Sequence, residues 1–410
     1  MKIFFSVGEP SGDLHGANLI RQLRSRRSDI ECVGYGGPLM REAVCNLNAD
    51  LTELAVMGLA PALLHLSRFW NLASQADRYF RHHRPDAVVM IDFPGFNWWI
   101  ARRAKAHGIP VFYYGVPQLW AWASWRVNKM RRLVDHALVK LPFEEKWFNE
   151  RGCHATHVGH PFFDQLQQQQ LDTHFINEQQ RKPGRLVTIL PGSRGQEIEY
   201  NFHWFLKAAQ RVIDAAPDTR FAVAAYKPKQ ARRLRELASG AKLPLEIHVG
   251  RTPELMAAAH CCMACSGSVS LELLYHTKPT AILYWMPQWT FTVLSHLVKV
   301  PYITLVNLLV ADELAPQNPK PYDPDGPKAD EPIFPEYPTC EDKSDRIAGH
   351  IIQWLSDPAC YQRVIDRLQA LKAEVAHGGA SKSAAQYILH AMEDVRTNEP
   401  VPHYFPRRAA

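Results

Sequence analysis

The sequence predicts an α/β protein made of two doubly wound parallel-sheet domains that face each other across a cleft. Three observations support this prediction. The chain has 410 residues, which is more than one ordinary hydrophobic core accommodates. Short apolar runs alternate with helical patterns along its length, and these runs are continuously apolar, as in strands covered on both faces. A polar, glutamine-rich stretch at 164–184 interrupts the alternation near the middle of the chain.

The apolar runs give the expected positions of the strands. Those before the polar stretch lie at 2–7, 30–35, 87–92, 110–114 and 135–139. Those after it lie at 186–190, 220–224, 245–249, 260–265, 280–284 and 302–306. In open parallel sheets, ligands bind beyond the carboxyl ends of the strands. The residues that follow these runs are therefore the first candidates for function.

The polar stretch, which ends in a Pro-Gly pair, is the expected domain junction. We expect an N-terminal domain over 1–167 and a C-terminal domain over 168–379. The remaining expectations are a proline-rich irregular insertion at 315–338, a helix at about 380–397 that packs back on the first domain, and a flexible tail over 398–410.

Composition and charge indicate a globular protein and do not indicate nucleic-acid binding. Hydrophobic residues make up 46% and charged residues 21% of the chain, as in ordinary globular proteins. The net charge of +6 is spread along the chain, so it favours an anionic partner only weakly and nucleic acid is not expected. The opening MKIFFSVGEP does not read as an export signal, so the eight cysteines predict reduced thiols in a cytoplasmic protein. Cys262 and Cys265 have no second pair at metal spacing, which favours a buried strand over metal or redox chemistry.

A glycine-rich loop follows the first predicted strand and precedes a helix. Its glycines, Gly8, Gly12 and Gly16, are spaced too widely for the dinucleotide fingerprint. A nucleotide site, a substrate site and a simple tight turn all remain open for this loop. The candidate binding residues in it are Gly8, Glu9, Ser11, Gly12 and Asp13.

Two further strand-to-helix turns, both in the second half, suit a nucleotide diphosphate. The first contains Gly192, Ser193 and Arg194, where backbone amides at a helix start and a guanidinium favour phosphate. The alternative is that Glu197 and Glu199 merely cap this helix.

The second turn contains Ser266, Gly267 and Ser268, which offer hydroxyl and amide donors. Glu272 lies four residues beyond Ser268 on the same helical face, where a carboxylate can accept ribose hydroxyls. Together the two turns predict a nucleotide diphosphate site in the second domain.

Asp92 is the candidate general base. It ends a buried apolar run and precedes a Pro-Gly pair, which places a carboxylate at the functional edge of a parallel sheet. The alternative is an aspartate that only caps the loop. Glu9 and Asp13 are competing carboxylates for the same role.

Three stretches bear on a membrane partner. Residues 118–133 interleave tryptophans with basic residues, as at an interface with lipid headgroups or single-stranded nucleic acid. Core-packed tryptophans beside a solvated basic face are the alternative. The apolar stretches at 56–72 and 285–300 favour lipid. Prolines and charges interrupt 56–72 and 281–310, so neither is expected to span a membrane.

An ordered set of motifs resembles the lipid-A-disaccharide synthase family over roughly residues 1–310. The motifs are GEPSGDLHGANLI, TELAVMG, IDFPGFN, QLWAW, LPFE, GHP, LPGSRGQEIE, CSGSVSLELL and VNLL. The resemblance implies a GT-B fold of two Rossmann-like domains and an inverting glycosyltransferase that requires no metal or cofactor. It also implies the substrates: UDP-2,3-diacylglucosamine as donor and the 6-hydroxyl of 2,3-diacylglucosamine 1-phosphate as acceptor. The products are a β-1,6 disaccharide and UDP, formed at the cytoplasmic face of the inner membrane.

The resemblance also assigns roles by position. Asp92 matches the essential acidic residue and Ser11 the serine of the opening motif. Arg194 matches the arginine of the PGSR loop, and Glu272 and Asn307 match further substrate-binding positions. Under this assignment Asp92 deprotonates the acceptor, and Arg194 with the helix starts at 193–197 and 266–270 stabilises departing UDP.

Three departures from the family pattern concern specificity. Gly95 stands where a second acid is common, Asp312 stands where a basic residue is common, and 315–331 is an insertion. Two alternatives therefore stay open. One is another UDP-GlcNAc-using enzyme of this fold, such as a peptidoglycan glycosyltransferase or a non-hydrolysing 2-epimerase. The other is an inactive homologue that binds a membrane surface. The residues leave acyl-chain length and a homo-oligomeric state undecided.

Overall fold

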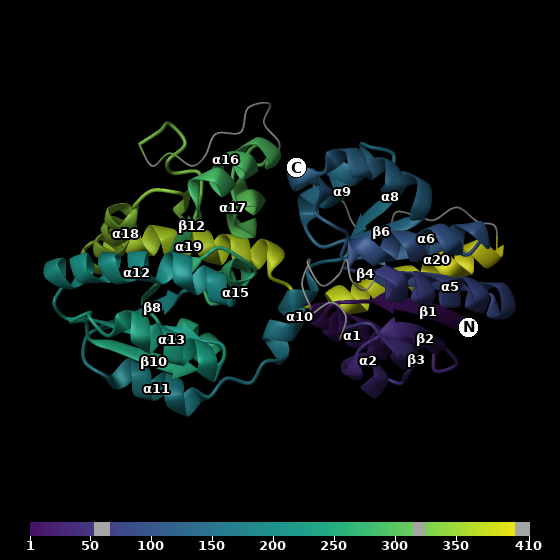
Figure 1. The fold of residues 1–410 in the computed structure, drawn as a ribbon, viewed down its shortest axis with the longest axis horizontal. Helices are drawn as coiled ribbons and strands as arrows, with labels where there is room; N and C mark the ends of the chain where they lie inside the picture. The colour runs from purple at the N-terminus through teal and green to yellow at the C-terminus, as the bar shows by residue number, and fades with distance from the viewer. Residues whose placement is uncertain (53–65, 315–322, 324, 398–410) are drawn as a thin grey trace. The chain divides into compact units, whose positions relative to one another are not determined.

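The computed structural model describes residues 1–52, 66–314, 323 and 325–397 (Figure 1). The chain forms two compact units. Unit 1 consists of Met1–Leu119, Ala123–Asp164 and the described residues from His377 onward, and unit 2 consists of Trp120–Trp122 and Gln165–Ala376. None of the helices in the described part of the chain has the length and apolarity needed to cross a bilayer.

Unit 1 is built on a seven-stranded, all-parallel sheet with the order β3-β2-β1-β4-β5-β6-β7. Its strands are β1 (Lys2–Val7), β2 (Glu31–Gly36), β3 (Cys45–Asp50), β4 (Ala87–Ile91), β5 (Val111–Tyr114), β6 (His136–Val139) and β7 (Ala155–His157). Its helices are α1 (Pro10–Arg26), α2 (Pro38–Glu42), α5 (Leu66–His83), α6 (Pro94–Ala106), α8 (Val127–Leu133), α9 (Pro142–Asn149) and α20 (Ala380–Thr397), with the short 3-10 turn η1 (Ser124–Arg126). The boundaries of the units fall within α7 (Leu119–Trp122) and α10 (Pro161–Gln168).

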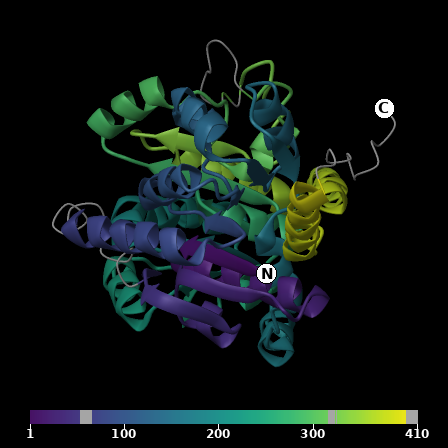
Figure 2. The same cartoon turned by 90° about the vertical axis from the view of Figure 1, so that its right-hand side faces the viewer.

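Helices cover both faces of this sheet. On one face, Ile20 of α1 and Ile388 of α20 pack with Phe5 of β1 in one buried cluster. Figure 2 shows α20 in yellow beside the purple N-terminal elements, although the two segments lie at opposite ends of the sequence. On the other face, the ring of Phe4 contacts that of Phe80 on α5. Because the central strands are buried on both sides, they are mostly apolar.

Unit 2 has a six-stranded parallel sheet with the order β10-β9-β8-β11-β12-β13. Its strands are β8 (Arg185–Leu190), β9 (Thr219–Ala225), β10 (Leu245–Val249), β11 (Cys261–Cys265), β12 (Thr280–Trp285) and β13 (Glu336–Thr339). Its helices are α11 (Thr173–Arg181), α12 (Gly195–Ala215), α13 (Pro228–Ala238), α14 (Thr252–Ala258), α15 (Val269–Tyr275), α16 (Gln288–Leu297), α17 (Leu305–Val310), α18 (Ser344–Ser356) and α19 (Pro358–Val375). The core joins α12 and α18 to the sheet through residues such as Phe202, Ile347 and Val223.

The prediction of two doubly wound parallel-sheet units is confirmed. One predicted strand is wrong: 302–306 is not a strand, and α17 begins at Leu305. Its β-branched residues favour a strand locally, but burial of Val306, Asn307 and Leu308 within unit 2 selects a helix. Tertiary packing therefore overrides the local preference.

Three strands escaped prediction because they lie at the margins of the sheets. β3 alternates polar residues, β7 has three residues, and β13 contains Pro338. β13 is an edge strand, where proline is tolerated. It also corrects the predicted irregular stretch 315–338, whose last residues belong to this strand. Residues 315–322 and 324 of that stretch, the predicted tail 398–410 and most of the apolar stretch at 56–72 lie outside the described residues.

Candidate functional site

In unit 1, charged side chains gather beyond the carboxyl ends of neighbouring strands. β1, β4, β5 and β6 are consecutive in the sheet and parallel, so their carboxyl ends share one edge. Glu9 follows β1, Asp92 follows β4, and Lys140 follows β6. These residues are remote in sequence, and the sheet order brings them to one edge.

The turn that carries Asp92 has a strained backbone. Asp92 and Phe93 have φ values of 45° and 46°, a region that residues other than glycine seldom occupy. The carbonyl oxygen of Asp92 accepts hydrogen bonds from Asn97 Nδ2 and Tyr113 Oη, both at 2.8 Å. The turn is therefore held in place by side chains from α6 and β5.

Asn97 belongs to a fully buried hydrogen-bond network. Ser6 Oγ donates to Asn97 Oδ1 at 2.6 Å, and neither residue is exposed to solvent. The amide thus ties the end of β1 to the start of α6 and to the Asp92 turn. In the sequence, Asn97 is marked only by its place in the motif IDFPGFN, because nothing local distinguishes a structural amide from a surface one.

The Asp92 carboxylate forms an ion pair with Lys140. Lys140 Nζ lies 3.4 Å from Asp92 Oδ1, and the two side chains are only 18% and 21% exposed. Burial would lower the pKa of Lys140, but the carboxylates of Asp92, Glu144 and Glu9 raise it above its usual value. The lysine is therefore a permanent cation beside the candidate base.

Three more titratable groups surround this ion pair. Burial, followed by the charge of Asp92, raises the pKa of Glu9, although Lys140 opposes the shift. Burial lowers the pKa of His15 to about 4, and burial with Lys140 and His15 lowers that of His160 well below its usual range. His15 Nδ1 is buried and has no hydrogen-bond partner among the described residues. Both imidazoles are thus neutral around pH 7.

The predicted glycine loop lies against the Asp92 turn. A Cβ on Gly8 would fall 2.3 Å from the ring of Phe93, so only glycine allows this contact. A Cβ on Gly12 would lie 3.8 Å from Asp92 Oδ2. Ser11 is exposed in the first turn of α1. The structure therefore brings Gly8, Gly12 and Asp92 together.

Asp13 has a different environment from its neighbours in the loop. It is 2% exposed, and its carboxylate accepts hydrogen bonds from the amides of Gly37, Leu39 and Met40 at 2.9 to 3.1 Å. These amides begin α2, so Asp13 stabilises the start of that helix. Its predicted contact with substrate gains no support from this placement.

In unit 2, the two predicted nucleotide-binding turns follow adjacent strands. β8 precedes the turn with Gly192, Ser193 and Arg194, and β11 precedes the turn with Ser266, Gly267 and Ser268. Because β8 and β11 pair in parallel, both turns lie at the same edge of the sheet. The structure thus brings these six predicted residues to one edge.

The first turn is already capped by a carboxylate. Glu197 Oε2 accepts hydrogen bonds from the amides of Ser193 and Arg194 at 2.9 and 3.0 Å. Gly192 has φ of 109°, and a Cβ there would lie 2.6 Å from Glu197. The capping role considered for Glu197 is therefore present. The Arg194 side chain is 81% exposed and reaches Glu197 only at 3.3 Å, so its guanidinium faces solvent.

Glu272 lies on α15, beyond the second turn. Burial, followed by the charge of Glu254, raises its pKa to about 7. A carboxylate with this pKa changes its charge near neutral pH. Its ability to accept hydroxyl groups as an anion therefore depends on pH.

Asn307 is a structural residue in this arrangement. It is fully buried, and its amide oxygen accepts from the amides of Ile333 and Phe334, both at 3.0 Å. Its Nδ2 donates to Phe334 O and to Glu336 Oε2. All four hydrogen-bonding positions of the amide are occupied, so the side chain holds α17 to the segment before β13.

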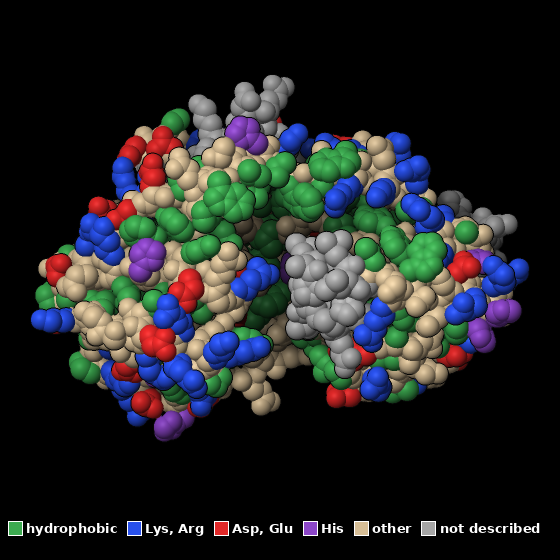
Figure 3. Space-filling model, in the orientation of Figure 1, with side chains coloured by type: hydrophobic (Ala, Val, Ile, Leu, Met, Phe, Trp, Pro, Cys, Tyr) green, Lys and Arg blue, Asp and Glu red, His purple; other side chains and the backbone are tan. Residues whose placement is uncertain are grey.

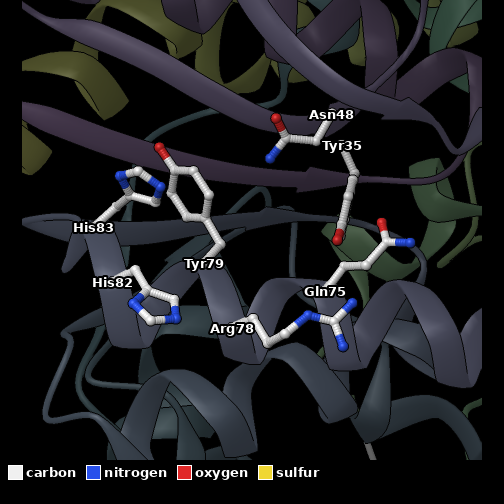
Figure 4. Close-up of a pocket in the computed structure, with 7 residues that line it drawn as sticks. All are labelled: Tyr35, Asn48, Gln75, Arg78, Tyr79, His82 and His83. Carbon is white, nitrogen blue, oxygen red and sulfur yellow. The ribbon is translucent and has the colours of Figure 1, made fainter.

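A shallow pocket of about 400 Å³ lies elsewhere in unit 1, between α5 and the strands β2 and β3 (Figure 4). Its lining residues are Tyr35, Asn48, Gln75, Arg78, Tyr79, His82 and His83. The Tyr79 and His83 rings stack at 4.4 Å, and Tyr35 Oη donates to Leu72 O. None of the predicted site residues lines this pocket.

Metal-ligand types do not cluster in the described residues: no group of three or more His, Cys, Asp and Glu side chains is arranged to hold a metal ion. All eight cysteines are free. Cys262 and Cys265 are buried in β11, as the predicted strand requires.

Exposed apolar side chains gather on α16 of unit 2. Trp289 is 73%, Val293 51% and Leu297 51% exposed, and no residue of this helix is buried. Figure 3 shows the hydrophobic side chains over this part of unit 2 in green. In the predicted tryptophan-rich segment, Trp125 of unit 1 is 65% exposed and lies under the guanidinium of Arg126 at 5.7 Å. Trp120 of the same segment, which belongs to unit 2, is buried.

Two Rossmann-like units, each with its candidate residues at the carboxyl edge of a parallel sheet, define a protein of the GT-B fold class. Solved structures agree. A UDP co-structure of MnaA from S. aureus shares this fold with a TM-score of 0.62 and 13% identity, over 99% of this chain and 100% of that one. The calicheamicin glycosyltransferase CalG4 has a TM-score of 0.55 and 16% identity, over 96% and 98% of the two chains.

Sequence comparison narrows the class. The family model for lipid-A-disaccharide synthetase matches residues 3–319. The lipid-A-disaccharide synthase of Trichlorobacter lovleyi is 31% identical over 396 residues, which cover 96% of this chain and 98% of that protein. The chain belongs to the lipid-A-disaccharide synthetase family.

Proposed function

We propose that this protein joins two acylated glucosamines by inverting glycosyl transfer. The donor is UDP-2,3-diacylglucosamine, and the acceptor is the 6-hydroxyl of 2,3-diacylglucosamine 1-phosphate. Family membership supports the reaction class. The observation that supports the residue assignment best is the placement of Asp92, a carboxylate in a strained turn at the carboxyl edge of the sheet in unit 1.

Unit 2 holds the donor in this proposal. The exposed Arg194 guanidinium and the amides at the start of α15 bind the diphosphate, whereas the amides of Ser193 and Arg194 already donate to Glu197. Glu272 accepts the ribose hydroxyls when it is ionised. Removing one such phosphate contact should cost about 3 kcal/mol in the transition state, which is on the order of a hundredfold in rate.

Unit 1 supplies the base. An α-linked donor that gives a β product requires one in-line displacement. The acceptor oxygen forms a bond to the anomeric carbon while the bond from that carbon to the phosphate oxygen breaks, and the electron pair leaves with UDP. Asp92 takes the proton from the 6-hydroxyl. Ser11, Gly8, Gly12 and Glu9 contact the sugar near this carboxylate, and no metal ion is required.

A membrane surface is the proposed partner, at the cytoplasmic face of the inner membrane. Both substrates carry acyl chains, and α16 exposes Trp289, Val293 and Leu297 without burying any residue. Tryptophan and aliphatic side chains on one exposed helix suit the boundary between headgroups and acyl chains. Exposed Trp125 beside Arg126 offers an apolar group and a cation in unit 1.

One assay tests the reaction. Purified protein is given both diacylated substrates, and UDP release is followed with and without EDTA. We expect release in both conditions. Turnover with unacylated UDP-GlcNAc alone would instead favour a 2-epimerase or another transferase of this fold.

A variant tests the base. Asp92→Asn should abolish turnover while leaving UDP affinity within about twofold, because the amide cannot accept the proton yet keeps the shape of the side chain. A collapse of UDP affinity would assign Asp92 to nucleotide binding instead.

Vesicle binding tests the membrane partner. Replacing Trp289 and Val293 together by serine should weaken sedimentation with vesicles that contain anionic lipid. The matched control is Val249→Ser, which removes a 38% exposed apolar side chain at the other end of the sheet in unit 2. Equal binding by all three proteins would remove α16 from the proposal.

A further inference from the structure

Lys140 has no role in the motifs, yet it occupies the most constrained position beside the candidate base. Its ammonium lies 3.4 Å from Asp92 Oδ1 and is largely shielded from water. Gly115, after β5, leaves the space for this pair, since a Cβ there would lie 3.3 Å from Asp92 Oδ1 and 3.6 Å from Lys140 Nζ.

The backbone of Lys140 is fixed independently of its side chain. Its amide donates to Glu144 Oε2 at 3.0 Å, and its carbonyl oxygen lies 3.2 Å from His157 Nε2. Glu144 is fully buried and also accepts from the Leu141 amide, at the start of α9. The side chain therefore extends from an anchored point toward Asp92, and its truncation should leave the start of α9 intact.

The charges that face the ion pair come from every neighbouring element. Glu9 approaches from the loop before α1, and its carboxylate repels that of Asp92. Glu144 from α9 is the second anion near Lys140. His15 from α1, His157 at the end of β7 and His160 after β7 have pKa values lowered by burial, so they carry no compensating charge at neutral pH.

We propose that Lys140 is a positioning residue whose ammonium offsets the negative charge of Glu9 beside Asp92 and fixes the orientation of the Asp92 carboxylate toward the acceptor hydroxyl. Without it, the carboxylates of Asp92 and Glu9 would lose the nearby cation that opposes their repulsion. The inference rests on the proposed function, because it assigns Asp92 the role of general base. It adds a residue to that site which no motif identifies.

The test is the pH dependence of UDP release by the full-length protein with both diacylated substrates. Lys140→Met removes the charge and keeps the length of the side chain, whereas Lys140→Arg keeps the charge. The matched control is Lys105→Met, which breaks the surface pair between Lys105 and Asp135 at 2.6 Å. Because all variants receive the same substrates, ionisation of the acceptor phosphate cancels in the comparison.

We expect the acid limb of the kcat/KM profile to move to higher pH by about 1–3 units in Lys140→Met. Activity should recover at alkaline pH, where the base is ionised without help, and the donor KM should stay within about twofold. Lys140→Arg and Lys105→Met should keep the limb of the unchanged protein. An equal loss at every pH, or an unmoved limb, would overturn the inference.

A second measurement does not need turnover. Competitive acetylation of the folded protein, read by mass spectrometry across pH, reports the pKa of Lys140. In Asp92→Asn this pKa should fall, because the carboxylate that raises it is gone. An unchanged value would overturn the inference even if Lys140→Met failed to fold. Absence of product from the unchanged protein would instead refute the proposed function.

Discussion

The side-chain amide of Asn97 is buried and supports the strained turn at Asp92. The variant Asn97→Ala should show how much stability and activity this amide contributes. The substitution removes the hydrogen bond from Ser6 Oγ and the one to the Asp92 carbonyl. Each is worth about 1 kcal/mol net, and leaving the buried Ser6 hydroxyl unpaired adds about 1–2 kcal/mol. We expect unit 1 to lose about 3 kcal/mol of unfolding free energy.

For a folding unit of this size, that loss lowers the melting temperature by about 6–12 °C. Differential scanning calorimetry should show the shift in the transition of unit 1, while the transition of unit 2 stays in place. Turnover at a temperature where the variant is still folded should fall at least about tenfold, because a relaxed turn moves the base away from the acceptor. The control is Asn71→Ala, which removes an exposed amide from α5.

The reasoning would be refuted by a melting shift below about 2 °C in Asn97→Ala, or by equal shifts in the two variants. Either result would mean that the positive φ values at Asp92 and Phe93 persist without the buried network. Full activity in a destabilised Asn97→Ala protein would separate the stability of the turn from its catalytic role.

Two further predictions concern unit 2. Burial raises the pKa of Glu272 to about 7, and in the proposed site its ionised form accepts the ribose hydroxyls. Affinity for UDP-GlcNAc should therefore rise with pH, about tenfold between pH 6 and 8. Isothermal titration calorimetry should show this dependence, and the Glu272→Gln variant should bind UDP-GlcNAc weakly and with equal affinity at both pH values. A pH-dependent affinity in Glu272→Gln would contradict the assignment. Gly192→Ala should lower the affinity for UDP about tenfold in the same assay. The φ of 109° disfavours any residue other than glycine, and a Cβ at this position would lie 2.6 Å from Glu197. Gly195→Ala, which meets no neighbour within 4 Å, is its control, and equal affinities would disprove the need for glycine at 192.

The fold could be predicted where strands are buried on both faces. The strands β1, β4 and β11 could be predicted from their apolar runs, because a strand covered by helices on both faces is mostly apolar. The edge strands β3 and β13 could not be found this way, since one side of each is unpaired and polar residues are tolerated there. The helix at Leu305 depends on contacts that the local sequence does not contain.

The residues of the candidate site also fall into those that the local sequence marks and those that only the fold reveals. Asp92, Arg194 and Glu272 could be proposed because a strand end or helix start marks each position locally. Lys140 and Asn97 could not be proposed from the sequence, since their importance comes from the order of strands in the sheet. In that order β1 lies next to β4, and β6 lies next to β5. Asp13 and Asn307 are polar residues of the motifs whose side chains accept hydrogen bonds from backbone amides inside the fold, and the motifs alone do not reveal these contacts.

Unit 1 is completed only by the end of the chain. The Asp164 carboxylate accepts the amides of Gly379, Ala380 and Ser381 at 2.5 to 3.0 Å, and so caps α20 at its start. α20 then buries Ile388 in the core that holds α1 and β1. During synthesis, unit 2 can therefore finish folding while unit 1, which carries Asp92, still lacks the helix α20 that packs on one face of its sheet. A ribosome that stops early would release a chain with a complete unit 2 and an unfinished unit 1, so the unit that carries Asp92 is assembled last.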